Sequence, residues 1–394
     1  MNEAMSHLRQ LSVEIGPRPA GSPAQHRAAD YIRAVFLAAG LEVETQEYAC
    51  PAWEHVATHL HLAGQPLEAT ANPFSRPCDV TAALVAVGTL PELEVAELQG
   101  CIGVLYGDLT ADQIAPKSWF LKGERDERIV ALLEAKRPAA LSTVQSVVGN
   151  VDAPIEDDEL DIPSASVGPG AGRALLAAAG AIAHLRIESR RSPGRSCNVV
   201  GRTPGRHDAW VVCCAHHDTK HGTPGAWDNG SGVAVLLTLA RRLGSHARSF
   251  GLEYVAFSGE ESLPIGDDEY VRRGGERFGQ IIAALNFDGV GAALGSNSIT
   301  AMSESAACHH AVTECSMHYP GVVWVDPWPQ SNHSTFAMRG VPSLAFTSRG
   351  APHLAHLRSD TIDWISPTKL AELVALAGDI VELLNRKTPA WTRP

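Results

Sequence analysis

The stretch CCAHHDTKHGTPGAWDNGSG, residues 213–232, decides how this chain is interpreted. It follows the apolar run AWVV at 209–212 and leads into VAVLLTLARRL at 233–243, which is typical of a helix. The polar stretch therefore lies between a predicted strand and a predicted helix. It contains three histidines and two aspartates, residue types that bind metal ions in proteins.

Three further apolar runs of the second half end abruptly in polar residues. LEYVAFS at 252–258 leads to Glu260 and Glu261, IIAALNF at 281–287 leads to Asp288, and PSLAFTS at 342–348 is followed by His356. Parallel strands joined by helices gather their loops at the carboxyl ends of the strands, where ligands bind. We therefore expect an α/β fold with a mixed, mostly parallel central sheet flanked by helices.

A change in the predicted secondary structure along the sequence divides the chain into two domains. A helix is predicted from Ser22 to Gly40, with Ser22 as its cap and Pro23 in its first turn, and Leu41 to Tyr48 alternates as a strand does. Short β-rich pieces follow. The prediction is a main domain of residues 1–51 and 191–394 with a small β-rich domain inserted at 52–190. Within the insert, the acidic segment 152–161 is expected to be an exposed loop.

Composition excludes several classes of protein. The net charge is −12, which argues against a nucleic-acid surface. No window reaches the length of a membrane span, and no signal peptide is seen, so a cytoplasmic location is expected. Eight cysteines without a CxxC pair fit thiols in a reducing compartment, although Cys308 and Cys315 are a possible pair. The sequence does not indicate an oligomeric state.

The polar residues at the predicted strand ends are those of a metal site. Carboxylates held close together repel one another, and divalent cations relieve the repulsion. Histidines and acids without cysteine suit zinc best, with cobalt or manganese as possible substitutes. The candidates exceed the needs of one tetrahedral ion with an open position, so two ions that share a bridging carboxylate are expected. The five candidate ligands are His216, Asp228, Glu261, Asp288 and His356.

Two neighbouring acids have other predicted roles. Glu260, beside Glu261, is expected to act as the general base for the attacking water. Asp218, two residues beyond His216, is expected to accept the other ring N–H of that histidine and fix its orientation.

Structural readings compete with these roles. Asp228 alone is a plausible helix cap, and the two glutamates are a plausible solvated pair. His333 and His353 compete with His356 for the fifth ligand position, and Arg349 is either a solvated side chain or a contact for a substrate carboxylate.

The motifs AHHDT, PGAWDNGSGVA, SGEES, NFDGVG and HLRSDT, in this order, resemble the co-catalytic zinc aminopeptidase family. That family also contains bacterial leucyl aminopeptidase, glutamate carboxypeptidase and the transferrin receptor. The opening segment IGPRPAGSPAQHRAADYIRAVFLAAGLEVETQEY is similar to the usual beginning of its members. LQGCIGVLYGD and IPSASVG within the insert are similar to a protease-associated domain.

The resemblance implies how the ligands are divided between two zinc ions. His216 and Asp288 would hold one ion, Glu261 and His356 the other, and Asp228 would bridge them. It also implies Glu260 as the base, Asp218 as the residue that orients His216, and a cis peptide bond between Asp228 and Asn229.

Four positions depart from the family's pattern. His217 stands where an aromatic residue or tyrosine is usual, Trp227 where a small or acidic residue is common, and Gly289 where a bulky residue is usual. Asn332 stands where relatives often have aspartate. None of these changes removes a ligand, and together they bear on substrate preference.

These observations predict a dizinc metallo-exopeptidase that hydrolyses N-terminal residues from short peptides. A carboxypeptidase of the same scaffold and a glutaminyl cyclase-like transferase with one zinc are the alternative enzymes. A binding module that has lost catalysis is a third alternative, which the complete set of candidate ligands disfavours.

Overall fold

The four apolar runs of the second half form adjacent parallel strands. β9 (Trp210–His216) lies between β10 (Gly251–Phe257) and β11 (Ile281–Phe287), and β14 (Ser343–Arg349) lies beyond β11. The register places Phe257 opposite His216 and Phe287 opposite Phe346. The predicted α/β fold with a mostly parallel central sheet is confirmed.

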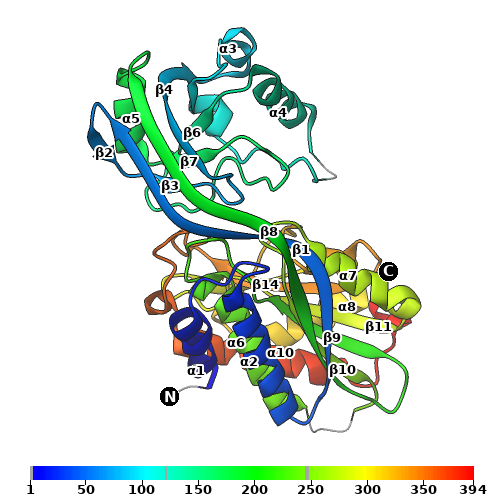
Figure 1. The fold of residues 1–394 in the computed structure, drawn as a ribbon. Coiled ribbons are helices and arrows are strands. Elements are labelled where there is room, and N and C mark those ends of the chain that lie inside the picture. Colours follow the sequence, from blue (N-terminus) through cyan, green and yellow to red (C-terminus); the bar gives the residue numbers. More distant parts are fainter. Residues whose placement is uncertain (1–2, 120–121, 245–247) are drawn as a thin grey trace. The chain divides into compact units, whose positions relative to one another are not determined.

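The computed structural model describes residues 3–119, 122–244 and 248–394, drawn as a ribbon in Figure 1. The chain divides into two compact units. Unit 1 comprises Met1–Cys50 and Arg195–Pro394, and unit 2 comprises Pro51–Gly194.

The central sheet of unit 1 continues on both sides of the four parallel strands. The carboxyl-terminal part of β8 (Ile182–Thr203) runs antiparallel to β10. On the other side, β12 (Ser296–Met302) runs antiparallel to β14 and pairs in parallel with β13 (Val322–Trp324). The strand order in this unit is therefore β13-β12-β14-β11-β9-β10-β8.

Helices cover both faces of this sheet. Because side chains alternate along a strand, Cys213 and Cys214 of β9 join different clusters of buried residues. Five helices pack against the face of Cys213: α1 (Glu3–Arg9), α2 (Pro23–Ala38), α6 (Gly232–Leu243), α8 (Ala306–Ser316) and α10 (Pro367–Leu383). Against the other face lie α7 (Ile265–Gly274) and α9 (His333–Ala337), and the short α11 (Pro389–Thr392) contacts β11. Burial on both faces explains why these strands are continuous apolar runs.

In the amino-terminal segment, the predicted helix is confirmed, but the strand after it is longer than predicted. Ser22 caps α2 by accepting the N–H of Gln25 at 3.1 Å, as expected. β1 (Glu42–Leu62) extends well beyond the predicted end at Tyr48. Its second part belongs to unit 2, where it pairs with β2 (Gln65–Leu67). β1 also pairs with β8, which is more than a hundred residues away in the chain, and a pairing with so distant a strand leaves no local signal in the sequence.

Unit 2 is built on a second set of parallel strands. The strands β4 (Cys78–Val87), β5 (Ile102–Leu105), β6 (Ala140–Val144) and β7 (Ser164–Val167) pair in parallel. The amino-terminal part of β8 and the short β3 (Thr70–Ala71) add antiparallel strands at the two sides. The α-helices in the described part of the unit are α3 (Leu90–Val95), α4 (Glu124–Lys136) and α5 (Pro169–Ala177).

The acidic segment of unit 2 is largely buried, and the prediction of an exposed loop was wrong. The carboxylate of Asp157 accepts the backbone N–H groups of Lys117 at 2.9 Å and Glu159 at 2.8 Å. Arg191 donates to the carbonyl of Asp158 at 2.7 Å. Acidic residues that satisfy backbone donors in this way form an internal part of the structure, which composition does not reveal.

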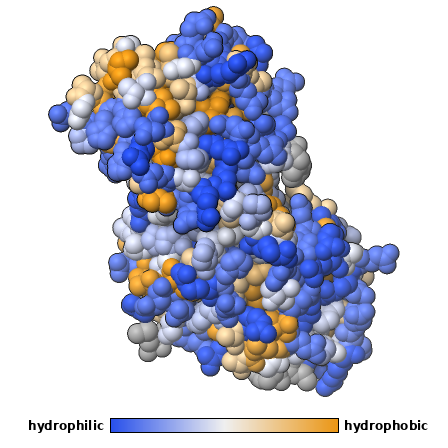
Figure 2. All heavy atoms as spheres, in the orientation of Figure 1, coloured by the Kyte–Doolittle hydropathy of each residue, from blue (hydrophilic) through white to orange (hydrophobic). Residues whose placement is uncertain are grey.

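All eight cysteines are free thiols. Cys308 and Cys315, the possible pair, both lie on α8. The visible face in Figure 2 is mostly hydrophilic, with apolar residues in small groups. Among the described residues, no helix has both the length and the apolar character needed to cross a membrane.

We predict that His7 makes the fold sensitive to acid. His7 on α1 is buried and its Nδ1 lies 2.6 Å from the hydroxyl of Tyr31 on α2. Burial lowers the pKa of His7 to about 4, from 6.5. The unfolded chain therefore binds an extra proton between these values, and stability is lost as the pH falls from 6.5 towards 4.

Chemical unfolding at pH 7 and pH 4.5 tests this prediction. The variant His7→Gln should lose less stability on acidification than the wild type, by on the order of 1–3 kcal/mol. The matched control is His26→Gln, at an exposed histidine of α2, which should follow the wild type. Equal acid sensitivity in His7→Gln and the wild type would contradict the assignment.

Candidate metal centre

The predicted site residues lie at one edge of the sheet of unit 1, where the parallel strands end. His216 is the last residue of β9, and Asp288 follows β11 directly. Glu260 and Glu261 follow β10 in a single loop, and His356 lies in the loop after β14. Because β10, β9, β11 and β14 are parallel neighbours, these loops meet at the same edge.

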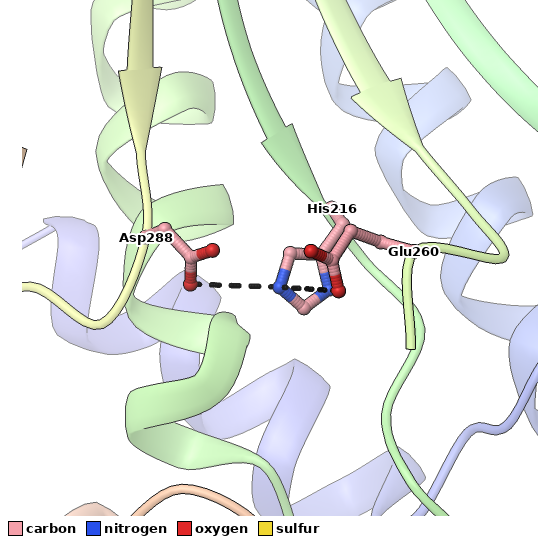
Figure 3. Close-up of side chains that lie close together, drawn as sticks. All are labelled: His216, Glu260 and Asp288. Carbon is pink, nitrogen blue, oxygen red and sulfur yellow. Dashed lines mark ion pairs between the residues drawn. The ribbon is translucent and has the colours of Figure 1, made fainter. Parts of the chain in front are cut away.

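Three carboxylates surround one ring nitrogen of His216. Its Nε2 lies 3.2 Å from Oδ1 of Asp228, 3.5 Å from Oδ1 of Asp288 and 3.9 Å from Oε2 of Glu260. Figure 3 shows the imidazole of His216 between Asp288 and Glu260. Ligand atoms of these three residues all lie within 4.8 Å of one another, a spacing that fits one metal ion.

The carboxylate of Asp228 is shared between two imidazoles. Its Oδ1 faces His216, and its Oδ2 lies 3.3 Å from Nε2 of His356. The same nitrogen of His356 lies 2.9 Å from Oε2 of Glu261. His216, Asp228 and Glu261 form the second group with a spacing that fits a metal ion. All five predicted ligands and Glu260 therefore converge, and Asp228 lies between the two histidines.

Asp218 supports His216 and the loop of the glutamates. Nδ1 of His216 lies 3.3 Å from the backbone oxygen of Asp218 and 3.7 Å from its Oδ1. The other carboxylate oxygen accepts the N–H of Glu261 at 3.3 Å. Burial opposes ionisation of Asp218, but the nearby ring of His216 holds its pKa below the usual value. Asp218 is therefore an anion behind the imidazole.

Burial and the closeness of other carboxylates shift the pKa values of the acidic residues in the cluster. Burial raises the pKa of Glu260 well above its usual value, and the charges of Asp288 and Glu261 add to the effect. The pKa of Glu261 is raised by burial and by Asp228. Burial also acts on Asp228, but hydrogen bonds to His216 and His356 lower its pKa. Four carboxylates thus share two imidazoles, and the set has an excess of negative charge.

The donors present fit divalent cations. They are nitrogen and oxygen atoms, without a cysteine, which is the set that zinc accepts at catalytic sites. Oε1 of Glu261 and Oδ1 of Asp218 are buried without a hydrogen-bond partner among the described residues. Buried charged oxygens without partners are costly, and metal coordination satisfies the oxygen of Glu261 directly.

A network of backbone contacts fixes the loop that carries Asp228. The peptide bond between Asp228 and Asn229 is cis, as expected. Oδ1 and Oδ2 of Asp360 accept the N–H groups of Trp227 at 2.7 Å and Asp228 at 3.0 Å. Asn229 donates to the carbonyl of Phe287 at 2.9 Å and so ties the loop to the end of β11. The sequence interpretation assigned no role to Asp360 or to the side chain of Asn229.

Arg18 is a second residue that sequence reasoning missed. It is fully buried and donates to three backbone carbonyls of the metal-site loops: His217 at 2.6 Å, Pro224 at 2.9 Å and Gly225 at 2.9 Å. Burial lowers the pKa of Arg18 to about 10, with Asp360 opposing the shift, so it stays a cation. Its sequence signal was the segment GPRPAG, an arginine between two prolines in the opening segment.

Two of the unusual residues compensate for each other. A Cβ atom added to Gly289 would lie 2.8 Å from Cζ2 of Trp227. The indole therefore occupies the space that a bulky side chain after Asp288 would need. The hydroxyl of Thr347 donates to the carbonyl of Gly289 at 3.3 Å, which attaches β14 to this turn.

The other unusual residues lie behind the site. His217 is buried, its Nε2 is 3.0 Å from the amide nitrogen of Gln25, and burial lowers its pKa to about 4. Asn332 donates to Asp267 at 2.8 Å. His333 is buried with its Nε2 2.6 Å from the carbonyl of Trp328, whereas His353 is exposed. Neither competes with His356 in the cluster described above.

Comparisons with known proteins find similar peptidases. Residues 198–381 match the model of peptidase family M28. Aminopeptidase YwaD of Bacillus subtilis is 27% identical over 398 residues, which cover 96% of this chain and 82% of YwaD. BSAP, a zinc aminopeptidase from Bacillus subtilis, has a TM-score of 0.81 at 23% identity, with 98% and 95% of the two chains covered. A peptidase M28 precursor from Shewanella amazonensis has a TM-score of 0.79 at 22% identity, with 100% and 95% covered.

We predict that Arg18 positions the loops of the metal site. Arg18→Met leaves buried carbonyls of these loops without donors, so the free energy of unfolding should fall by about 2–5 kcal/mol. The affinity for zinc should fall as well, because the loop that carries Asp228 loses its support. Chemical unfolding and zinc titration with a competing chelator measure the two effects.

The control is Arg248→Met, at another buried arginine, which pairs with Glu382 at 2.7 Å. This variant should lose stability but bind zinc as the wild type does. If both variants bind zinc equally well, Arg18 has no positioning role.

Proposed function

We propose that the chain is a member of peptidase family M28 and a two-zinc aminopeptidase that removes N-terminal residues from short peptides. One observation carries the proposal, namely that the two oxygens of Asp228 face two different imidazoles at 3.2 Å and 3.3 Å. A carboxylate shared in this way suits two ions rather than one.

The proposed ligands divide into two sets around Asp228. His216 and Asp288 would hold one ion, Glu261 and His356 would hold the other, and Asp228 would be a ligand of both. When bound, the two ions supply Lewis acidity, which lowers the pKa of a water molecule and polarises the scissile carbonyl. Cobalt and manganese are substitutes that the same donors accept.

Glu260 is the proposed general base. It follows β10 beside Glu261, its Oε2 lies 3.9 Å from Nε2 of His216, and its side chain remains 23% exposed. A carboxylate at the open side of the cluster reaches both the attacking water and the leaving nitrogen. Glu260 takes the proton of the water and delivers it to the leaving amine. Asp218 holds the ring of His216 in the orientation that the site needs.

The sequence relatives support an aminopeptidase rather than a carboxypeptidase. Aminopeptidase YwaD aligns with 96% of this chain. Arg18, the buried cation beside the site, donates to backbone carbonyls and does not offer its charge to a substrate.

Two further proposals concern the rest of the chain. We propose that residues 51–194 form a protease-associated-like domain, which the motifs quoted above and the β-rich composition of unit 2 support. We also propose a cytoplasmic location, because all eight cysteines are unpaired thiols.

The first test compares wild type and Glu260→Gln on aminoacyl nitroanilides. The wild type should release the free amino acid and should not hydrolyse N-acetylated substrates. Glu260→Gln should lose about two to four orders of magnitude in kcat because proton transfer is lost. Its zinc content, measured by elemental analysis, should equal that of the wild type. Near-normal turnover in this variant would exclude Glu260 as the base.

The second test addresses the shared carboxylate. Asp228→Ala removes a ligand common to both ions, so the purified protein should contain neither at zinc concentrations that saturate the wild type. Asp288→Ala is the comparison, because it removes a ligand of one ion only and should retain the other. One ion retained in Asp228→Ala would argue against bridging.

A further inference from the structure

Both glutamates of the cluster lie on one closed loop. Residues 258–266, which we call the glutamate loop, lead from the end of β10 into the first turn of α7 and carry Glu260 and Glu261. The two ends of this loop lie against each other, because a Cβ atom added to Gly266 would collide with the carbonyl oxygen of Ser258. A residue that holds these ends together therefore controls the shape of the loop between them.

A buried amide joins the two ends. Asn198 of β8 is 0% exposed. Its Oδ1 accepts the N–H of Ser258 at 3.2 Å, and its Nδ2 donates to the carbonyl of Gly266 at 2.7 Å. The pairing of β8 with β10 ends with Val199 opposite Ala256, and the side chain of Asn198 continues the connection beyond that point. One planar group thus binds the backbone at the beginning and at the end of the glutamate loop.

Two further side chains fix the beginning of the loop. The hydroxyl of Tyr48 on β1 donates to the carbonyl of Ser258 at 2.5 Å. The hydroxyl of Ser196 lies 2.8 Å from that of Ser258, and both Tyr48 and Ser196 are buried. The backbone N–H and the backbone carbonyl of Ser258 are therefore both bound by side chains. Asn198 connects this fixed point to Gly266 at the other end.

The two glutamates depend on the loop to different degrees. Glu261 has contacts of its own, because Asp218 accepts its N–H at 3.3 Å and its Oε2 lies 2.9 Å from Nε2 of His356. The carboxylate of Glu260 lies 3.9 Å from Nε2 of His216, beyond hydrogen-bond distance (Figure 3). The place of the Glu260 carboxylate therefore follows mainly from the backbone that carries it.

We propose that Asn198 is a positioning residue for the reaction, whose amide closes the glutamate loop and so holds Glu260 where it takes the proton of the attacking water. The proposal rests on the aminopeptidase function proposed above. Asn198 touches neither the substrate nor the metal ions and acts through Glu260. A general base must lie within hydrogen-bond reach of the proton that it removes, and a displacement of about 1 Å costs about a hundredfold in rate.

The first test compares the wild type with Asn198→Ala on aminoacyl nitroanilides at saturating zinc. The kcat should fall by about tenfold to a hundredfold, because the ends of the loop are no longer joined. The KM should stay within about twofold of the wild type, because the lost contact acts on proton transfer. The zinc content should be unchanged, since Glu261 keeps its other contacts. A raised KM with an unchanged kcat, or a lower zinc content, overturns the proposal.

A second variant covers the case in which Asn198→Ala does not fold. Asn198→Asp keeps the size of the side chain and the acceptor for Ser258, but it cannot donate to the carbonyl of Gly266. It should show the same fall in kcat with an unchanged KM and zinc content. A wild-type kcat in this variant overturns the proposal.

A double-mutant cycle with Glu260→Gln separates a positioning role from a general structural one. If Asn198 acts through Glu260, adding Asn198→Ala to Glu260→Gln should lower kcat by less than about threefold, because the base is already absent. If the loss is the same about tenfold to a hundredfold in both backgrounds, Asn198 does not act through Glu260 and the proposal is wrong.

Asn72→Ala is the matched control. Asn72 is 1% exposed and lies in unit 2, where it accepts the hydroxyl of Ser166 at 2.6 Å and donates to that of Thr143 at 3.4 Å. The variant removes a buried amide with two hydrogen bonds without touching the glutamate loop, so its kcat should equal that of the wild type. A loss as large as that of Asn198→Ala would show a general effect of removing such an amide and would overturn the proposal.

Amide hydrogen exchange of the zinc-free protein tests the loop without activity. Peptides that cover residues 258–266 should exchange about tenfold faster in Asn198→Ala than in the wild type or in Asn72→Ala, as followed by mass spectrometry. Equal exchange in all three proteins overturns the proposal. If the wild type hydrolyses no aminoacyl nitroanilide, or if Glu260→Gln keeps normal turnover, the proposed function fails instead. The exchange experiment then still decides whether Asn198 holds the loop.

Discussion

Mutual repulsion among buried carboxylates is the constraint on which the catalytic unit depends. Asp228, Glu260, Glu261 and Asp288 meet at one edge of the sheet with only two imidazoles among them. Such a group is costly to assemble, because each acid loses hydration and gains like-charged neighbours. The fold holds the carboxylates in place through a parallel sheet that is apolar on both faces. The same arrangement makes the edge a strong binding site for divalent cations.

Two buried charged residues away from the cluster support this arrangement. Arg18 brings the amino-terminal segment to the loops that follow β9, and Asp360 binds the backbone on either side of Trp227. Neither offers an atom to a metal ion in the proposed site. Both satisfy backbone groups of irregular loops, which otherwise have no partners in a buried position. The precision of the cluster therefore depends on residues nearly the whole chain length apart.

The structure shows which residues contact the positions that depart from the family's pattern. Trp227 and Gly289 are complementary, since the indole fills the space that glycine leaves open. Asn332 donates to the buried Asp267, and His217 lies against Gln25 in the interior. Residues that looked unusual one at a time thus act in pairs with partners far away in the sequence.

The sequence by itself determined the strands, their shared carboxyl edge and the identity of the converging residues. The continuous apolar runs that lead to His216, Glu261 or Asp288 predict buried strands from local patterns alone. Ser22 and Pro23 predict the start of their helix in the same way. Only the tertiary structure decided the full length of β1, the burial of the acidic segment around Asp157, and the roles of Arg18 and Asp360. Each of these depends on a partner distant in the chain, and the energy of such a contact leaves no periodic trace in the residues around it.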